Sequence, residues 1–104
     1  MRGTISGFAV RVLTTSPTPA VSWSYPPAAD LEGFQLYRAE NDGQLLAYRL
    51  IDATTPDLRF TNSTFTYLDR DTIPGTRYTY KLLARHQDGG YSPFTPALSV
   101  QLPR

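Results

Sequence analysis

The chain has 104 residues, 40% hydrophobic and 12% aromatic, which is enough for one domain with its own core. It has no cysteine, which excludes disulfides, thiol catalysis and cysteine metal sites. The net charge of +1 predicts neither nucleic acid nor a membrane surface as a partner. The longest uncharged stretch, 12–29, contains four prolines and no long apolar run, so we expect no membrane insertion.

Four strands are predicted in the first half of the chain, where β-branched and aromatic residues dominate between Gly and Pro breaks. Their ranges are 8–13, 20–25, 34–38 and 45–51. The second strand alternates cleanly, which puts Trp23 on an inward face. In the third, Phe34 and Leu36 point inward. The turn at 41–43, Asn-Asp-Gly, separates the third strand from the fourth.

The second half of the chain contains a turn that leads into a regular strand. Pro74 and Gly75 form the turn, and the residues that follow at period two, Tyr78, Tyr80, Leu82 and Ala84, fall on one face. This is the sequence form of a tyrosine corner. We expect the Tyr78 hydroxyl to donate to a backbone carbonyl in the 69–73 loop. Tyr80→Phe should be milder than Tyr78→Phe if the Tyr80 hydroxyl reaches water.

Three further segments are candidate strands. Two short ones, 58–61 and 65–68, flank Asn62-Ser63, and the last covers 97–102. Pro93 and Pro96 place the start of the last strand at a sheet edge. No helical segment is present to cross between parallel strands. The sequence therefore predicts an all-β, seven-stranded antiparallel β-sandwich with immunoglobulin-like topology.

Four motifs in this order resemble the fibronectin type III family, over about 8–102. Segment 21–27 resembles the family's second strand with its core Trp, and 30–38, Asp-Leu-Glu-Gly-Phe-Gln-Leu-Tyr-Arg, is similar to the third strand of bacterial members. Segments 67–78 and 88–93 resemble the approach to the sixth strand and the final hairpin. The family's usual Leu or Val before the turn proline is Thr72 here, so we expect the loop to shift by one residue and bury Ile73.

The resemblance implies a single fibronectin type III-like domain over 1–104, excised from a larger multidomain protein. Bacterial members commonly lie beside glycosidase domains or in surface arrays. The resemblance therefore implies an extracellular or cell-surface location, with neighbouring domains of the parent polypeptide or another protein as partners.

No set of residues indicates catalysis, and we predict neither an enzyme nor a cofactor. His86 is the sole histidine and is expected at a solvated strand end. Asp69 and Asp71 form the closest carboxylate pair. A calcium site there is one interpretation. A turn whose carboxylates accept backbone N–H bonds is the one we favour.

Four residues are candidates for partner binding. Tyr37 and Leu83 are expected to share one exposed sheet face, and Tyr91 and Phe94 lie near the last hairpin. For Tyr37 and Leu83 the interpretation we favour is a cross-strand pair that stabilises the sheet, and for Tyr91 and Phe94 a loop-anchoring role is the alternative. The leading hypothesis for the chain is a non-catalytic spacer and interaction module, because the first and last strands of such a sandwich leave it at opposite ends. The alternative is a carbohydrate-binding accessory domain of a glycoside-degrading enzyme, which needs two or three exposed, coplanar rings.

Overall fold

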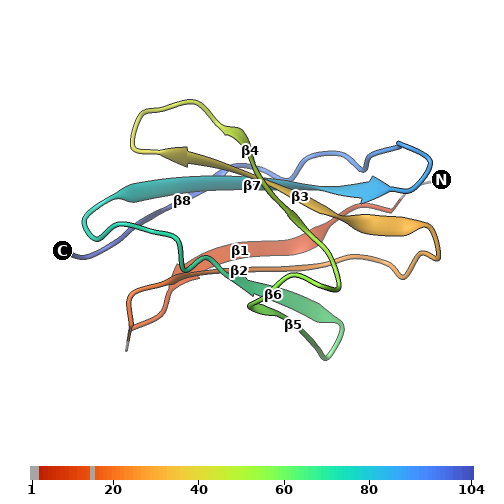
Figure 1. Cartoon of the computed structure of the whole chain (residues 1–104), viewed down its shortest axis with the longest axis horizontal. Helices are drawn as coiled ribbons and strands as arrows, with labels where there is room; N and C mark the ends of the chain where they lie inside the picture. The colour runs from red at the N-terminus through yellow and green to blue at the C-terminus, as the bar shows by residue number, and fades with distance from the viewer. Residues whose placement is uncertain (1–2, 15) are drawn as a thin grey trace.

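The chain folds into two antiparallel β-sheets packed face to face, as a computed structural model shows for residues 3–14 and 16–104 (Figure 1). Eight strands and no helix are assigned within these residues: β1 (Ser6–Val12), β2 (Pro19–Ser24), β3 (Leu31–Glu40), β4 (Leu46–Ile51), β5 (Leu58–Thr61), β6 (Thr64–Leu68), β7 (Arg77–His86) and β8 (Leu98–Gln101). The sheets have the orders β1-β2-β6-β5 and β4-β3-β7-β8. The predicted all-β sandwich is confirmed.

The predicted number of seven strands is wrong, because both short segments beside Asn62-Ser63 form strands. Thr61 at the end of β5 pairs with Thr64 at the start of β6. Asn62 and Ser63 between them have φ values of 52° and 64°. Two successive positive φ values are typical of a type I′ turn, whose twist matches that of a two-residue hairpin.

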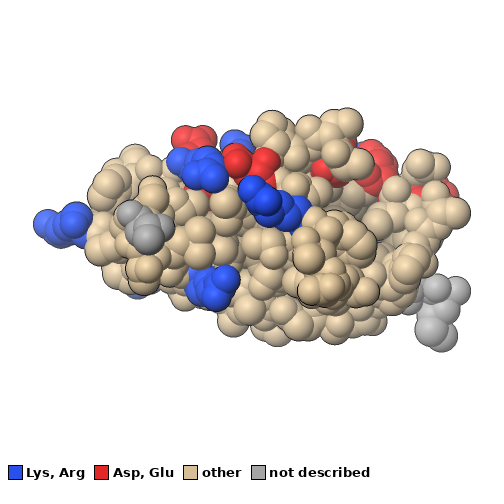
Figure 2. Space-filling model, turned by 90° about the horizontal axis from the view of Figure 1, so that it is seen from below, with Lys and Arg blue, Asp and Glu red and all other residues tan. Residues whose placement is uncertain are grey.

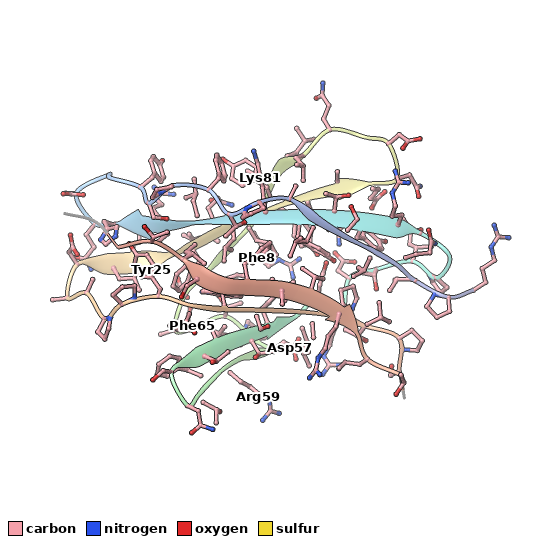
Figure 3. The ribbon with its side chains drawn as sticks, turned by 180° about the vertical axis from the view of Figure 1, so that it is seen from behind. Phe8, Tyr25, Asp57, Arg59, Phe65 and Lys81 are labelled. Carbon is pink, nitrogen blue, oxygen red and sulfur yellow. The ribbon has the colours of Figure 1, made fainter. Side chains whose placement is uncertain are left out.

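The core lies between the sheets, on the strand faces that alternation predicted. Trp23 is fully buried, 5.1 Å from Phe34 and 5.6 Å from Phe65 between ring centroids. Figure 3 shows Phe65 on β6 and Phe8 on β1, and both pack against this core. The predicted core residues that are buried are Trp23, Phe34, Leu36, Tyr78, Tyr80, Leu82 and Ala84.

The Pro74-Gly75 turn precedes β7 as expected, and Gly75 has a φ of 81° that favours glycine. The Tyr78 hydroxyl does reach the 69–73 loop, but as an acceptor: the backbone N–H of Ile73 donates to it at 2.8 Å. The predicted direction of this bond is therefore wrong. In a loop outside both sheets, the backbone N–H of Ile73 needs an acceptor, and Tyr78 supplies one.

The loop before this turn does not shift to bury Ile73, whose side chain is 63% exposed. The expectation that Ile73 replaces the family's apolar residue is therefore wrong. The loop uses the backbone of Ile73, through Tyr78, and leaves its side chain at the surface. Ile73 therefore holds the loop to Tyr78 through its backbone N–H, and its side chain adds no volume to the core.

The molecule is elongated, with extents of 43 × 29 × 22 Å. The chain enters β1 from one end of the long axis and leaves after β8 at the other end (Figure 1). The strands run roughly along this axis, so the sandwich separates its two ends by most of its length.

Candidate functional site

The outer face of the β4-β3-β7-β8 sheet carries the predicted partner-binding residues. Tyr37 on β3 is in register with Lys81 on β7. The neighbouring Leu36 and Leu82 are fully buried on the opposite face of the same strands. Because successive side chains alternate, Tyr37 and Lys81 point away from the core, and Figure 3 shows Lys81 on that outer side.

The segment after the last hairpin brings Phe94 to the same face. Ser92 and Thr95 donate their backbone N–H groups to the carbonyls of Ala84 and Leu82 on β7, each at 2.9 Å. Their hydroxyls in turn accept from the N–H groups of the same two residues, at 2.8 and 3.0 Å. Side chains thus complete the pairing in a stretch interrupted by Pro93 and Pro96, which cannot donate.

Tyr37, Lys81 and Phe94 together form what we call the outer patch. The Tyr37 and Phe94 ring centroids are 5.2 Å apart with an interplanar angle of 81°. The Lys81 ammonium lies 3.9 Å from the Phe94 centroid and 5.6 Å from that of Tyr37, within reach of cation–π attraction. Phe94 remains 45% exposed. The patch combines apolar area with one positive charge.

The other two predicted partner-binding residues, Leu83 and Tyr91, are not part of the outer patch. Leu83 is in register with Gln35 on the outer face, but it is only 6% exposed, so the prediction that it is exposed for binding is wrong. Alternation along a strand predicts on which face of the sheet a side chain lies. Whether that side chain is buried depends on which other segments cover that face. Tyr91 is 56% exposed, and its backbone forms an isolated antiparallel β-bridge with that of Arg85 on β7.

The outer patch does not form a flat platform for sugar rings. Two rings at 81° to each other cannot both stack on one flat ligand face. The Lys81 ammonium lies close over the Phe94 ring as well. The rings of the outer patch therefore share no common plane.

His86 lies at the end of β7 but is buried, so its expected solvation is wrong. Its Nε2 meets the Tyr25 hydroxyl at 2.8 Å, and its Nδ1 meets the Asp30 carboxylate at 2.9 Å. The backbone N–H of Gln87 also donates to the Asp30 carbonyl at 2.8 Å. Together these contacts fasten the loop between β2 and β3 to the end of β7.

Asp69 is fully buried and accepts three side-chain hydrogen bonds. Its carboxylate receives the hydroxyls of Tyr80 at 2.6 Å and Tyr48 at 2.7 Å and the guanidinium of Arg38 at 3.0 Å. We call these four residues the Asp69 cluster. The expectation of backbone donors is wrong, because the donors are side chains from β3, β4 and β7. The Tyr80 hydroxyl therefore does not reach water.

Asp71 is the other half of the predicted carboxylate pair. Its carboxylate does not join the hydrogen bonds of the Asp69 cluster. Its backbone carbonyl accepts from Arg38 at 2.8 Å, while its side chain is 76% exposed. With Asp69 engaged by three donors, the two carboxylates do not converge on a shared cation. No group of three or more metal-ligating side chains occurs among residues 3–14 and 16–104.

The Asp69 cluster shifts the acidity of its tyrosines. Burial, together with the negative charge of Asp69, raises the pKa of Tyr80 above its ordinary value. The same two causes raise the pKa of Tyr48. The sequence signal for this cluster was a pair of carboxylates just after a strand, Asp69 and Asp71, which does not reveal that three other strands supply donors to Asp69 alone.

Comparison with known proteins gives no matching family model and no matching curated sequence. Within the described part of the chain, no helix is long and apolar enough to cross a membrane.

Proposed function

We propose that this chain is a fibronectin type III-like spacer and interaction module of a larger extracellular or cell-surface polypeptide, without catalytic activity. The observation that carries this proposal is that the chain enters β1 and leaves β8 at opposite ends of a 43 Å sandwich (Figure 1). A rigid body with this layout holds its neighbours apart at a fixed distance. Two antiparallel sheets packed face to face, an aromatic core between them and the contact of Tyr78 with the loop before β7 support the resemblance.

The outer patch supports the interaction half of the proposal. Aromatic rings and a cation on the side of the sandwich form the kind of surface that a neighbouring domain can cover. Figure 2 shows the opposite side of the sandwich, the face of the β1-β2-β6-β5 sheet, where charged side chains gather mainly along one edge. The outer patch, on the side where Lys81 lies, is the candidate contact surface.

The spacer half is tested by the distance between the chain ends. Because the chain has no cysteine, Thr4→Cys with Arg104→Cys provides the only two thiols for donor and acceptor dyes. We expect single-molecule energy transfer to give one narrow distance distribution that does not change when folded domains are fused at both ends. A Gly/Ser linker of the same number of residues is the matched control, and it should give a broad distribution. A distribution as broad for the chain as for the linker would contradict a spacer role.

The interaction half is tested at Lys81, the sole lysine of the chain. In the polypeptide that contains the neighbouring domains, we expect Lys81 to react more slowly with an amine-acylating reagent than in the chain alone. Phe94→Ser should restore the faster reaction. Equal rates in the two contexts would remove the outer patch as a contact surface, and glycan binding that requires Phe94 would favour an accessory carbohydrate-binding role instead.

A further inference from the structure

An apolar cavity of about 400 Å³ opens between the two sheets beside β5. Its apolar lining comes from β3, β4, β5 and β6 and includes Phe34, Ile51, Leu58, Phe60 and Phe65. The volume falls within the range of small-molecule sites in proteins. The cavity is separate from the outer patch, which lies on the far side of the β4-β3-β7-β8 sheet.

Phe60 lines this cavity and is largely exposed. It is paired with Phe65, so it occupies the inner side of its strand, and the two ring centroids are 4.5 Å apart. Phe60 is nevertheless 61% exposed. Most large inner-face side chains are covered by the opposite sheet. Here the ring remains at the mouth of the cavity, where it can contact a molecule that enters.

The charged side chains that line the cavity are both carboxylates, Glu32 and Asp52. Asp52 is fixed in position, because its Oδ1 accepts from the N–H of Thr54 at 2.9 Å and from its hydroxyl at 2.6 Å. These bonds also lower the pKa of Asp52 below its ordinary value. Glu32 lies 3.4 Å from Arg85 and is partly neutralised. Asp52 is therefore the main charge that a bound molecule would meet.

We infer that this cavity is a binding site for a small aromatic ammonium compound, with its ring against Phe60 and Phe65 and its ammonium beside Asp52. The apolar floor favours a ring, and the negative rim favours a cation over an anion of the same shape. This inference goes beyond the spacer role. A ligand at the mouth between the sheets touches neither the chain ends nor the outer patch, so either proposal can fail without the other.

Three probes of matched shape test the inference: phenethylamine, 2-phenylethanol and 3-phenylpropionate, which are cationic, neutral and anionic at neutral pH. Each is titrated into the ¹⁵N-labelled chain, and amide shifts are followed. We expect phenethylamine to move signals from 31–34, 51–53 and 58–65. Its affinity should exceed that of the alcohol by up to about fivefold, the contribution of a partly exposed ion pair. Added salt should reduce this difference.

Two variants separate the charge from the apolar contact. Asp52→Asn should make phenethylamine and 2-phenylethanol bind equally, whereas Phe60→Ala should weaken both. Asp71→Asn removes the same charge from a carboxylate outside the cavity and should leave both affinities unchanged. Tighter binding of 3-phenylpropionate than of the amine, shifts confined to other regions, or no shifts from any probe would each overturn the inference.

Discussion

At the scale of single residues, Asp69 is a fully buried charge, and its placement bears directly on stability. A buried carboxylate is strongly unfavourable unless donors compensate for its lost hydration. Asp69 has three, from Arg38, Tyr48 and Tyr80, and it is fully buried. A network satisfied in this way makes the geometry specific, because no one member can move without leaving the charge short of a donor.

Tyr80 should therefore matter more than the corner tyrosine. Tyr80→Phe keeps the ring and removes one donor to a buried charge, so we expect a loss of roughly 1.5–3 kcal/mol. Tyr78→Phe removes only the acceptor for Ile73 N–H, and roughly 0.5–1.5 kcal/mol is expected. Urea unfolding of both variants gives the comparison. A larger loss for Tyr78→Phe would mean that the Tyr80–Asp69 bond contributes little in solution.

The charge of Asp69 can be tested against a neighbouring exposed carboxylate. Asp69→Asn breaks a buried ion pair and leaves Arg38, whose side chain is 12% exposed, with only the more exposed Glu40 at 3.5 Å as a charged partner. We expect a loss of about 3–5 kcal/mol in the free energy of unfolding. Asp71→Asn makes the same chemical change at a side chain that is 76% exposed and should alter stability little. Equal, small effects of the two substitutions would show that the Asp69 charge is not required.

Residue positions that depend on distant partners were the ones sequence reasoning missed. Period-two alternation identified Trp23 and Tyr78 as inward because the pattern lies within one strand. The burial of His86 requires Tyr25 and Asp30, which are 61 and 56 residues away. No local pattern encodes contacts of that separation, so a strand-end histidine looked solvated.

At the scale of elements, the sequence predicted where strands occur along the chain better than it predicted where each strand begins and ends. The third strand was expected over 34–38, whereas β3 covers Leu31–Glu40. With the additional residues, β3 pairs with β7 from Leu31 opposite His86 to Glu40 opposite Tyr78, with one irregularity between Leu31 and Gly33. A central strand can extend through Gly33 and polar positions because its neighbours supply hydrogen bonds that the local sequence does not reveal.

The β5–β6 hairpin offers a direct test of turn geometry. Ser63 has a φ of 64°, a conformation that a non-glycine residue adopts only at a cost. Ser63→Gly removes this strain, and we expect a gain of up to about 1 kcal/mol in the free energy of unfolding. Ser63→Val, with a branched side chain at the same position, should destabilise the hairpin. Thermal melts of both variants provide the measurement, and a loss on Ser63→Gly would mean that the turn has another conformation.

At the scale of the whole molecule, two kinds of contact join the sheets. The aromatic core around Trp23 fills the space between them. The Asp69 cluster adds a polar connection, because Asp69 follows β6 of one sheet while Arg38, Tyr48 and Tyr80 lie on the other. Because these hydrogen bonds join the two sheets, we expect their loss to lower the stability of the whole sandwich and not of one loop alone.

This connection predicts how stability depends on alkaline pH. The pKa values of Tyr48 and Tyr80 are raised in the folded chain by burial and by Asp69, while unfolded tyrosine titrates at about 10. The neutral hydroxyls therefore stabilise the fold fully below about pH 10, and this contribution declines as pH rises from there toward the raised folded pKa values. We expect the melting temperature to fall over that range, and the tyrosinate absorbance of these two residues to grow only as the chain unfolds. Tyr91→Phe, at an exposed ring, should leave the profile unchanged. Ionisation of every tyrosine with no loss of stability would show that Asp69 does not require these two donors.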